Sequence, residues 1–431
     1  MEKSANIAKT WLIYYNKAVN TNDKNMENIN NDPSKIKDVL ERGVEKIYPN
    51  REEVEKVLLS GKKLKIYCGF DPSAPALHIG NAIQLIKLSH FQDLGHEIIF
   101  LIGDFTGMIG DPTDKNATRR KLTREEVTAN AKKYKQQASR FIKFSGVNPA
   151  RVVKNSKWLD KITFKDLIEL SSNFTVQQMI IRDMFQERLK EEKPIHLHEF
   201  LYPLAQGYDT VALDVDMEIG GNDQMFNMMA GRHLMKALKD KEKFVITNKL
   251  IADDTGKKMG KSEGNVVFLD EEPNNVYGKI MSWPDGVLGV AFELCTKLPY
   301  EDVRKIQEKL KDLNINPRDL KMKLAFEITK LIHGAGKAKK AQDYFIRTIQ
   351  KKEAPMTITN YELKITNIKL IDLLVEIKFA SSKGDARRLI EQGGVKINEE
   401  VTKDFNKELT VTPEGFVLQK GKLNFIRVVK I

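Results

Sequence analysis

KIYCGFDPS, residues 65–73, is the stretch that decides the fold, because an apolar run of strand length ends there in a proline turn. The chain then has the pattern of a helix from Ile79 to about Leu94, which Gly95 ends. A second apolar run, residues 98–102, reads as a buried strand. Strand, helix and strand joined by short loops form a βαβ unit, which predicts parallel strands and a right-handed crossover.

A second unit of the same kind follows later in the chain. Residues 211–217 are expected to be a strand, 224–238 a helix and 244–247 another strand. Residues 122–200, between the two units, have a mainly helical pattern and are expected to provide a dimer surface. The sequence therefore predicts an α/β domain with a Rossmann-like parallel sheet and a helical insertion.

The remaining parts of the chain differ in composition and periodicity. Pro33 opens a helix that is expected to reach Glu45, Pro284 and Pro317 interrupt a later helical region, and Pro355 lies in a polar connecting stretch. We divide the chain into five consecutive segments: 1–32, disordered or an extension; 33–272, the α/β domain; 273–350, an α-helical domain; 351–366, a linker; and 367–431, a small α+β domain.

Composition limits the classes of protein that this chain can represent. Its 431 residues are 41% hydrophobic and 30% charged, as in globular proteins, and no apolar run is long enough to cross a bilayer. Two cysteines, Cys68 and Cys295, are too few for a disulfide framework or a cysteine-based zinc site, which favours a reducing, cytoplasmic setting. Residues 301–431 contain 27 basic and 18 acidic side chains and so carry +9 of the net +12. This excess indicates either a polyanionic partner, such as nucleic acid, or a solvated lysine-rich surface.

The first chemical motif is HIGN, residues 78–81, at the start of the first helix. A helix N-terminus binds phosphate through its free N–H groups and its dipole. Gly80 would let a nucleobase or ribose lie close to the backbone, and His78 and Asn81 can both donate hydrogen bonds to phosphate oxygens. Taken alone, however, a histidine in this place is more often a capping or surface residue.

The second motif is KKMGKS, residues 257–262, in the polar loop 253–265. It is not a Walker A motif, because Thr255 stands where that motif requires glycine. A lysine run is usually a solvated loop, but a mobile loop of this kind can also neutralise charge over a polyphosphate.

A third segment, YPLAQGYD at residues 202–209, has polar side chains in an unusual place. Tyr202, Gln206 and Asp209 fall at i, i+4 and i+7, on one helical face. Apolar neighbours argue against a simple solvent face, so this face is predicted to line a polar site.

Together, these segments resemble a known family. HIGN and KMGKS, 180 positions apart, are similar to the paired HIGH and KMSKS motifs of class I aminoacyl-tRNA synthetases. YPLAQGYD and the following GGNDQ (220–224) resemble tyrosyl-tRNA synthetases of the bacterial type, as do YCGFDPS (67–73) and TGMIGDP (106–112). The resemblance runs from about residue 33 to residue 431.

The resemblance implies an enzyme that activates L-tyrosine with ATP and transfers it to tRNA(Tyr). It also implies a homodimer, and Mg²⁺ that accompanies ATP without a dedicated metal site in the protein. The residues implied to bind tyrosine are Tyr67 and Asp209 at the phenol hydroxyl, Asp111, Tyr202 and Gln206 at the ammonium group, and Gln224 near the carboxylate. Those implied at the ATP site are Gly69, Asp71, Gly80, Asn81, Gly221 and Asp223, with Ser73 and His78 at the γ-phosphate. Those implied to act on the pyrophosphate are Lys258, Lys261 and Ser262, assisted by Lys115 and Arg119.

Two residues depart from the usual pattern of the family. Asn81 replaces the second histidine of HIGH, which keeps a hydrogen-bond donor but loses a possible cation. Glu218 stands where many relatives have glutamine, and this extra carboxylate would either favour the ammonium group of the substrate or pair with a lysine.

Residues 382–398, in the tail, resemble a small RNA-binding fold named after a ribosomal protein of the small subunit. Lys383, Arg387 and Arg388 fall on one helical side, and the turn at 393–394 brings Lys396 nearby. This pattern suits phosphate contacts on folded RNA, although a solvated amphipathic helix would have it too. The resemblance further implies that 273–350 binds the anticodon arm of tRNA.

Two other interpretations remain open. A tryptophanyl-tRNA synthetase would share the fold, but Tyr202, Gln206 and Asp209 speak against it. An RNA-binding or splicing cofactor built on a synthetase scaffold would keep the fold without the activity.

Overall fold

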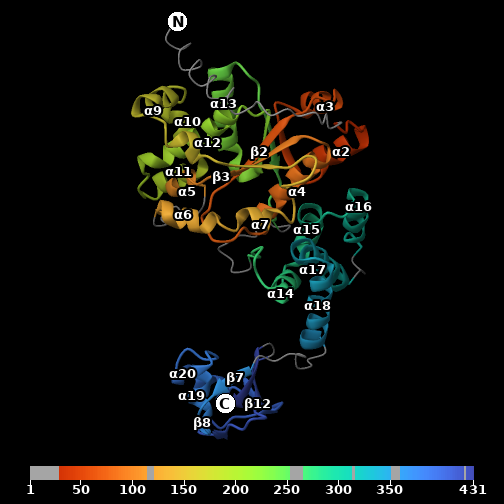
Figure 1. Ribbon diagram of the computed structural model, residues 1–431, viewed down its shortest axis with the longest axis vertical. Helices are drawn as coiled ribbons and strands as arrows, with labels where there is room; N and C mark the ends of the chain where they lie inside the picture. Colours follow the sequence, from red (N-terminus) through yellow and green to blue (C-terminus); the bar gives the residue numbers. More distant parts are fainter. Residues whose placement is uncertain (1–28, 114–120, 253–265, 313–315, 351–359, 422–423) are drawn as a thin grey trace. The chain divides into compact units, whose positions relative to one another are not determined.

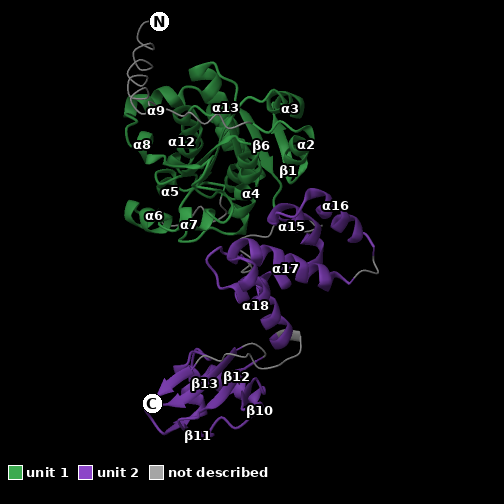
Figure 2. Cartoon of the chain, turned by 45° about the vertical axis from the view of Figure 1, so that its right-hand side comes forward, with its two compact units in different colours: residues 1–250 green, residues 251–431 purple. Residues whose placement is uncertain are grey.

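The computed structural model describes residues 29–113, 121–252, 266–312, 316–350, 360–421 and 424–431. The chain divides into two compact units, residues 1–250 and 251–431 (Figure 2). This division comes earlier in the chain than the boundary expected after residue 272. The expectation of disorder at the start of the chain concerns residues that, up to residue 28, lie outside the described part. None of the helices in the described segments is long and apolar enough to span a membrane.

A six-stranded sheet forms the centre of the first unit (Figure 1). Its strand order is β1-β6-β5-β2-β3-β4. Neighbouring strands are parallel except for β1, which runs antiparallel to β6. The chain passes from β2 (Lys65–Phe70) through α4 (Ile79–Asp93) to β3 (Glu97–Ile102), which confirms the predicted βαβ unit. The remaining strands are β1 (Val44–Tyr48), β4 (Arg151–Lys154), β5 (Met217–Gly221) and β6 (Phe244–Asn248).

The second βαβ unit is also present, but the strand predicted at residues 211–217 is wrong. Helix α12 (Leu197–Leu213) continues through this stretch, and β5 begins only at Met217. Val211, one of the apolar residues that suggested a strand, instead packs with Leu234 of α13 (Met225–Lys239). β5 is buried throughout although it ends in two glycines, so its sequence reads as a turn rather than as a central strand.

The two edge strands β1 and β4 are missing from the sequence predictions. The helix expected to reach Glu45 ends earlier, as α2 (Pro33–Glu41), and β1 follows it. β4 interrupts the insertion, which is otherwise helical as predicted. Both strands are short and partly exposed, so they lack the continuous apolar run of a central strand. The other helices of this unit are α3 (Arg51–Leu59), α5 (Thr106–Ile109), α6 (Arg124–Ala131), α7 (Tyr134–Ala138), α8 (Ser156–Leu159), α9 (Phe164–Ser171), α10 (Val176–Ile180) and α11 (Asp183–Lys190).

Helices α12 and α13 pack closely because glycines face each other across the contact. A Cβ atom added to Gly207 of α12 would lie 3.2 Å from the backbone nitrogen of Gly231 on α13. A larger residue at either position would push the helices apart. This contact holds in place the helix that carries Tyr202, Gln206 and Asp209.

The first part of the second unit is helical, as predicted. Its helices break at both expected prolines, since Pro284 follows the end of α14 and Pro317 is the first residue of α17, capped by Asn316. Trp283, Tyr277 and Phe292 are fully buried within this part. The helices are α14 (Pro273–Met281), α15 (Leu288–Cys295), α16 (Tyr300–Lys309), α17 (Pro317–His333) and α18 (Ala335–Phe345).

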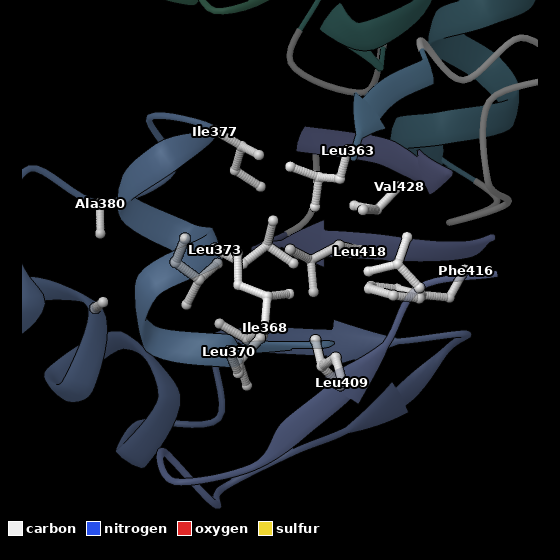
Figure 3. Packing of buried hydrophobic residues seen from close by; sticks show 14 of the residues in the cluster. Leu363, Ile368, Leu370, Leu373, Ile377, Ala380, Leu409, Phe416, Leu418 and Val428 are labelled. Atoms are coloured by element: carbon white, nitrogen blue, oxygen red, sulfur yellow. The ribbon is translucent and has the colours of Figure 1, made fainter. Parts of the chain in front are cut away.

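The tail combines two helices with two small sheets around one apolar core (Figure 3). Leu363, Leu373 and Leu418 meet in this core. The predicted linker at 351–366 is wrong for residues 360–363, which form strand β7 and pair in parallel with β13. The elements are β7 (Asn360–Leu363), β8 (Asn367–Lys369), α19 (Leu370–Glu376), α20 (Lys383–Glu391), β9 (Val395–Ile397), β10 (Glu400–Val401), β11 (Glu408–Thr410), β12 (Phe416–Lys420) and β13 (Asn424–Lys430).

Candidate active site

The strand order of the first unit defines where a ligand is expected to bind. Parallel α/β sheets bind ligands at the carboxyl ends of their strands, where successive connections leave in opposite directions. In this sheet that point lies between β2 and β5, since β3 follows on one side of β2 while β5 and β6 lie on the other. Gly69 and Asp71 lie at the carboxyl end of β2, and Gly221 and Asp223 lie at that of β5. Gly69 is exposed although it belongs to a central strand.

Asp71 is the centre of a hydrogen-bond network at this edge. The hydroxyl of Tyr202 donates to its Oδ2 over 2.8 Å, and the hydroxyl of Thr106 donates to its Oδ1 over 2.6 Å. Gly103 makes the second contact possible, because a Cβ atom there would lie 1.9 Å from Asp71 Oδ1. Burial raises the pKa of Asp71 to about 7, against the opposing effect of the two hydrogen bonds.

Asp209 extends the same network into the core. Its side chain is 2% exposed and accepts hydrogen bonds from Trp158 Nε1 at 2.7 Å and from Asn155 Nδ2 at 3.1 Å. Asn155 Nδ2 also donates to Thr106 Oγ1 at 3.0 Å and so connects Asp209 with Asp71. Burial raises the pKa of Asp209 well above its ordinary value, although both donors lower it. The polar face of α12 therefore turns into the protein rather than toward solvent.

Tyr67 lies in the same buried group. Its hydroxyl is 3.0 Å from Thr210 Oγ1, and its partner on the neighbouring strand β5 is Glu218. Burial raises the pKa of Tyr67, and the negative charges of Glu218 and Asp209 raise it further. Tyr67 and Asp209 are thus brought together, although each is hydrogen-bonded to other partners.

A buried ion pair joins Glu218 to Lys243, the residue before β6. The Lys243 ammonium donates to Glu218 Oε2, to Thr210 Oγ1 at 3.2 Å and to the carbonyl of Met228 at 3.0 Å. The second carboxylate oxygen of Glu218 accepts from Gln206 Nε2 at 3.0 Å. Burial lowers the pKa of Lys243, and the carboxylate of Glu218 opposes this. Of the two possibilities left open for Glu218, the structure contains the pairing with a lysine.

Asp111 and Gln224 form a third polar contact. Gln224 Nε2 donates to Asp111 Oδ2 at 2.6 Å and to Thr113 Oγ1 at 3.2 Å. Asn227 Nδ2 donates in turn to Gln224 Oε1 at 3.1 Å. The two residues assigned to opposite ends of the amino-acid backbone are therefore neighbours.

His78 caps the helix that it opens. Its Nδ1 accepts from the backbone nitrogen of Gly80 at 3.1 Å, and its own backbone nitrogen donates to Asn81 Oδ1 at 3.0 Å. Gly80 is needed for this geometry, because a Cβ atom there would lie 2.9 Å from His78 Cε1. Since Nδ1 is an acceptor, a neutral ring carries its proton on Nε2, which is the nitrogen that can donate to a ligand. Ser73, by contrast, is exposed in the turn after β2.

The residues assigned to the pyrophosphate fall outside the described part of the chain. They are Lys115, Arg119, Lys258, Lys261 and Ser262.

Three of the four basic residues assigned to RNA in the tail are exposed on one helix, and the fourth is half-buried on a strand. Lys383, Arg387 and Arg388 belong to α20, and Lys396 lies on β9. The three cations of α20 lie near carboxylates, with the closest pairs at 2.6 Å, 2.8 Å and 3.9 Å. Exposed ion pairs contribute little, so these side chains can exchange a carboxylate for a phosphate.

Sequence reasoning missed several hydrogen-bond partners of the site. Thr106, Asn155, Trp158 and Lys243 each hydrogen-bond to a predicted site residue or to its neighbour Glu218. Asn155 directly follows β4, and polar residues just after a strand are a signal for a site in this fold class. That signal was hidden because β4 itself was not predicted.

Comparison with known proteins agrees with this geometry. A family model described as tRNA synthetases class I (W and Y) matches residues 59–350, and one described as a tyrosine–tRNA ligase SYY-like C-terminal domain matches residues 350–428. The chain therefore belongs to the class I tRNA synthetases. The tyrosine–tRNA ligase of Thermotoga maritima is 44% identical over 394 residues, which cover 90% of this chain and 96% of the relative. That of Moorella thermoacetica is 42% identical and covers 90% of this chain and 94% of the relative. Within the class, this chain belongs to the tyrosine–tRNA ligase family, as the sequence motifs predicted.

Solved structures give the same fold. A C-terminally truncated mitochondrial tyrosyl-tRNA synthetase from Coccidioides posadasii has a TM-score of 0.58 at 23% identity, covering 79% of this chain and 97% of that one. Tyrosyl-tRNA synthetase from Archaeoglobus fulgidus, in complex with L-tyrosine, has a TM-score of 0.57 at 20% identity, covering 72% of this chain and all of that one (100%). At these identities the likeness concerns the fold alone, and it confirms the predicted fold class.

Proposed function

We propose that this chain activates L-tyrosine with ATP to give tyrosyl-adenylate and pyrophosphate, and then transfers the tyrosine to the 3′ end of tRNA(Tyr). The observation that carries the proposal is the buried polar face of α12, which is hydrogen-bonded to Asp71 at the carboxyl end of β2. Membership of the tyrosine–tRNA ligase family supports the same reaction. The reaction uses ATP and tRNA, so we place it in the cytoplasm.

The phenol hydroxyl of tyrosine would bind between Tyr67 and Asp209. Trp158 and Asn155 each occupy only one lone pair on an oxygen of Asp209, so the carboxylate keeps the capacity to accept a further proton donor. Phenylalanine would bury the same groups without the further hydrogen bond that the hydroxyl of tyrosine supplies, which is unfavourable for a desolvated carboxylate. Tyrosyl-tRNA synthetase is the established example of this kind of selectivity, which needs no editing site.

The amino-acid backbone would bind at the opposite end of α12. Asp111, Tyr202 and Gln206 would hold the ammonium group, and Gln224 would lie near the carboxylate. The hydrogen bond from Gln224 to Asp111 supports this arrangement, because it brings the groups for the two ends of the amino-acid backbone together.

ATP would bind along the carboxyl ends of β2 and β5, at Gly69, Asp71, Gly221 and Asp223. Gly80 and Asn81 would lie at the same nucleotide, and Ser73 and His78 at its γ-phosphate. The carboxylate of tyrosine is already ionised, so it attacks the α-phosphate without a general base. Catalysis then rests on positioning and on stabilising the charge of the departing pyrophosphate. Mg²⁺ would enter with ATP, and Lys258, Lys261 and Ser262, with Lys115 and Arg119, would complete the charge compensation.

The tail would bind the tRNA through Lys383, Arg387, Arg388 and Lys396, while residues 273–350 would contact the anticodon arm. The exposure of α20 and the basic excess of residues 301–431 support this role. Contacts from cations to phosphates suit a folded RNA, whose shape is recognised more than its base edges.

A homodimer would form through the helical insertion. Helices α9, α10 and α11 lie beside α12, away from α2 and α3 (Figure 1). Large apolar side chains are exposed there, with Phe164 at 79%, Ile181 at 70% and Leu197 at 82%. Such a concentration of apolar surface is typical of a protein interface.

Sedimentation tests the dimer. The wild-type chain is expected to sediment as a dimer at micromolar concentration, and Phe164→Glu combined with Ile181→Glu is expected to give monomers. Val147→Glu is the matched control, because Val147 is equally exposed at 81% but lies outside these helices. A wild-type chain that sediments at the monomer mass would contradict the proposal.

Tyrosine-dependent ATP–pyrophosphate exchange tests the activity directly. Folded protein that shows no exchange would rule the reaction out, and exchange with tryptophan instead of tyrosine would change the substrate. Recovery of intron or ribosomal RNA instead of tRNA in a pull-down would favour the splicing cofactor.

A further inference from the structure

The buried pair of Lys243 and Glu218 has all its polar atoms engaged. Lys243 is fully buried, and its three ammonium hydrogens face three acceptors on Glu218, Thr210 and Met228. Gly231 leaves the room for this group, because a Cβ atom there would lie 2.7 Å from Lys243 Nζ. The packing of α12 on α13 is therefore built around a charge inside the protein.

A buried ion pair is not by itself a source of stability, since apolar residues of similar size often serve as well. What distinguishes this pair is the second oxygen of Glu218, which accepts a hydrogen bond from Gln206 Nε2 at 3.0 Å. Glu218 also neighbours Tyr67 in the adjacent strand. The pair thus connects the core to two residues of the proposed tyrosine site.

The contact with Glu218 decides how the amide of Gln206 is oriented. A glutamine amide has one end that only donates and one end that only accepts. A carboxylate can only accept, so it selects the nitrogen end of Gln206. The carbonyl oxygen is then the end left for a ligand, and an ammonium group requires an acceptor of this kind.

We infer that the Lys243–Glu218 pair is a positioning unit that selects the orientation of the Gln206 amide in which the carbonyl oxygen faces the ammonium group of tyrosine. The inference rests on the proposed tyrosine site and adds a residue pair that sets specificity for the amine. Lys243 holds the carboxylate of Glu218, and Glu218 in turn holds the amide.

Replacing Glu218 by glutamine reverses this orientation while preserving the shape of the side chain. The single acceptor oxygen of the new amide is taken by the Lys243 ammonium, so its NH₂ group faces Gln206. Gln206 then turns its oxygen toward the new amide and its own NH₂ group toward the ligand. Two hydrogen-bond donors, the NH₂ group of Gln206 and the ammonium group of the substrate, would then face each other.

Two probes separate this effect from general damage to the site. Tyrosinol keeps the amine and lacks the carboxylate, whereas 3-(4-hydroxyphenyl)propionate keeps the carboxylate and lacks the amine. Measured by calorimetry, Glu218→Gln should weaken tyrosinol by about tenfold or more, as expected for one lost hydrogen bond to a charged group. It should leave 3-(4-hydroxyphenyl)propionate within about twofold of the wild type.

A second substitution, Lys243→Met, should restore the tyrosinol binding that Glu218→Gln removes. In Glu218→Gln combined with Lys243→Met, no ammonium claims the oxygen of the new amide, so this oxygen can accept from Gln206 again. Tyrosinol binding should return to within about threefold of the wild type. A merely structural role predicts that the double variant is no better than the single one.

Controls keep the test decisive if the single variant does not fold. Glu218→Met with Lys243→Met is also uncharged, but it cannot accept from Gln206, so it should bind tyrosinol about tenfold more weakly than Glu218→Gln with Lys243→Met. Lys87→Met removes another buried ammonium, which donates to the carbonyls of Val39 and Arg42, and it should change the binding of neither ligand.

Two outcomes would overturn the inference. One is equal weakening of the binding of both probes in Glu218→Gln, and the other is equal tyrosinol binding by the two uncharged double variants. Failure of the proposed function would look different, because the wild-type protein itself would then bind neither probe.

Discussion

Asp209→Asn should reduce the selectivity for tyrosine far more than the use of ATP. In the wild-type chain both oxygens of Asp209 accept hydrogen bonds, from Trp158 Nε1 at 2.7 Å and from Asn155 Nδ2 at 3.1 Å. An asparagine has only one oxygen, so its nitrogen must face one of these two donors. The side chain then turns away or leaves a buried donor unpaired, and in either case it loses the charge that would accept the phenol proton of tyrosine.

The size of the effect follows from the hydrogen bond that is lost. A hydrogen bond to a charged group contributes about 1.5–3 kcal/mol, and a loss of ~2 kcal/mol corresponds to roughly a 30-fold change. The kcat/KM for tyrosine in ATP–pyrophosphate exchange should fall by about this factor, while that for phenylalanine, which lacks the hydroxyl, should remain within about twofold. The KM for ATP should also remain within about twofold, because Asp209 does not touch the nucleotide in the proposed site.

Asp104→Asn is the matched control for this change. Asp104 is another buried carboxylate of the same unit, and it accepts from the backbone nitrogen and the hydroxyl of Ser156 at 2.9 Å and 2.8 Å. Its replacement should leave the ratio of tyrosine to phenylalanine unchanged. Equal losses for tyrosine, phenylalanine and ATP in Asp209→Asn would refute the assignment of Asp209 to the phenol hydroxyl.

Three further predictions concern packing, RNA binding and pH. Gly207→Ala places a methyl group 3.2 Å from the backbone nitrogen of Gly231, and should lower the free energy of unfolding by about 1–3 kcal/mol; an unchanged urea midpoint would show that the helices can separate freely. Arg387→Ala with Arg388→Ala should weaken tRNA binding and reduce the slope of log K against log salt by about two, with tyrosine-dependent exchange unaffected; an unchanged slope would remove these residues from the RNA surface. Burial raises the pKa of Asp71 to about 7 in the folded chain. The contribution of this carboxyl group to the free energy of unfolding is therefore complete at pH values below its ordinary pKa of 3.8, and it is lost as the pH rises through 7. Asp71→Asn does not titrate and should therefore gain in melting temperature relative to the wild type between roughly pH 4 and pH 8, whereas a pH-independent difference would contradict the raised pKa.

The parts of the fold that could be predicted are those whose signal is local. The unit from β2 through α4 to β3 can be predicted from the sequence because two apolar runs flank a helix that ends at a glycine. β5 could not be predicted from the sequence, because residues 217–221 form a strand only through burial between β2 and β6. β1 and β4 depend in the same way on a neighbouring strand that is distant in the sequence.

The candidate site likewise contains residues that have a local sequence signal and residues that have none. Tyr202, Gln206 and Asp209 share a helical face, so their spacing alone indicates that they act together. Their partners come from other segments, as Asn155 and Trp158 follow β4 and Lys243 precedes β6. No periodicity connects residues that meet only after the sheet has formed, and the choice of partner for Glu218 therefore had to come from the structure.

The cap formed by His78 has a consequence for how the first turn of α4 is studied by mutagenesis. Its Nδ1 holds the backbone nitrogen of Gly80, so the imidazole is at once part of the scaffold and a candidate ligand for phosphate. An alanine in this place would fray the turn as well as remove the ring, and the measured loss of rate would overstate what the ring does to ATP. Asparagine is the better baseline, because its side-chain oxygen can still cap the helix while the imidazole is gone.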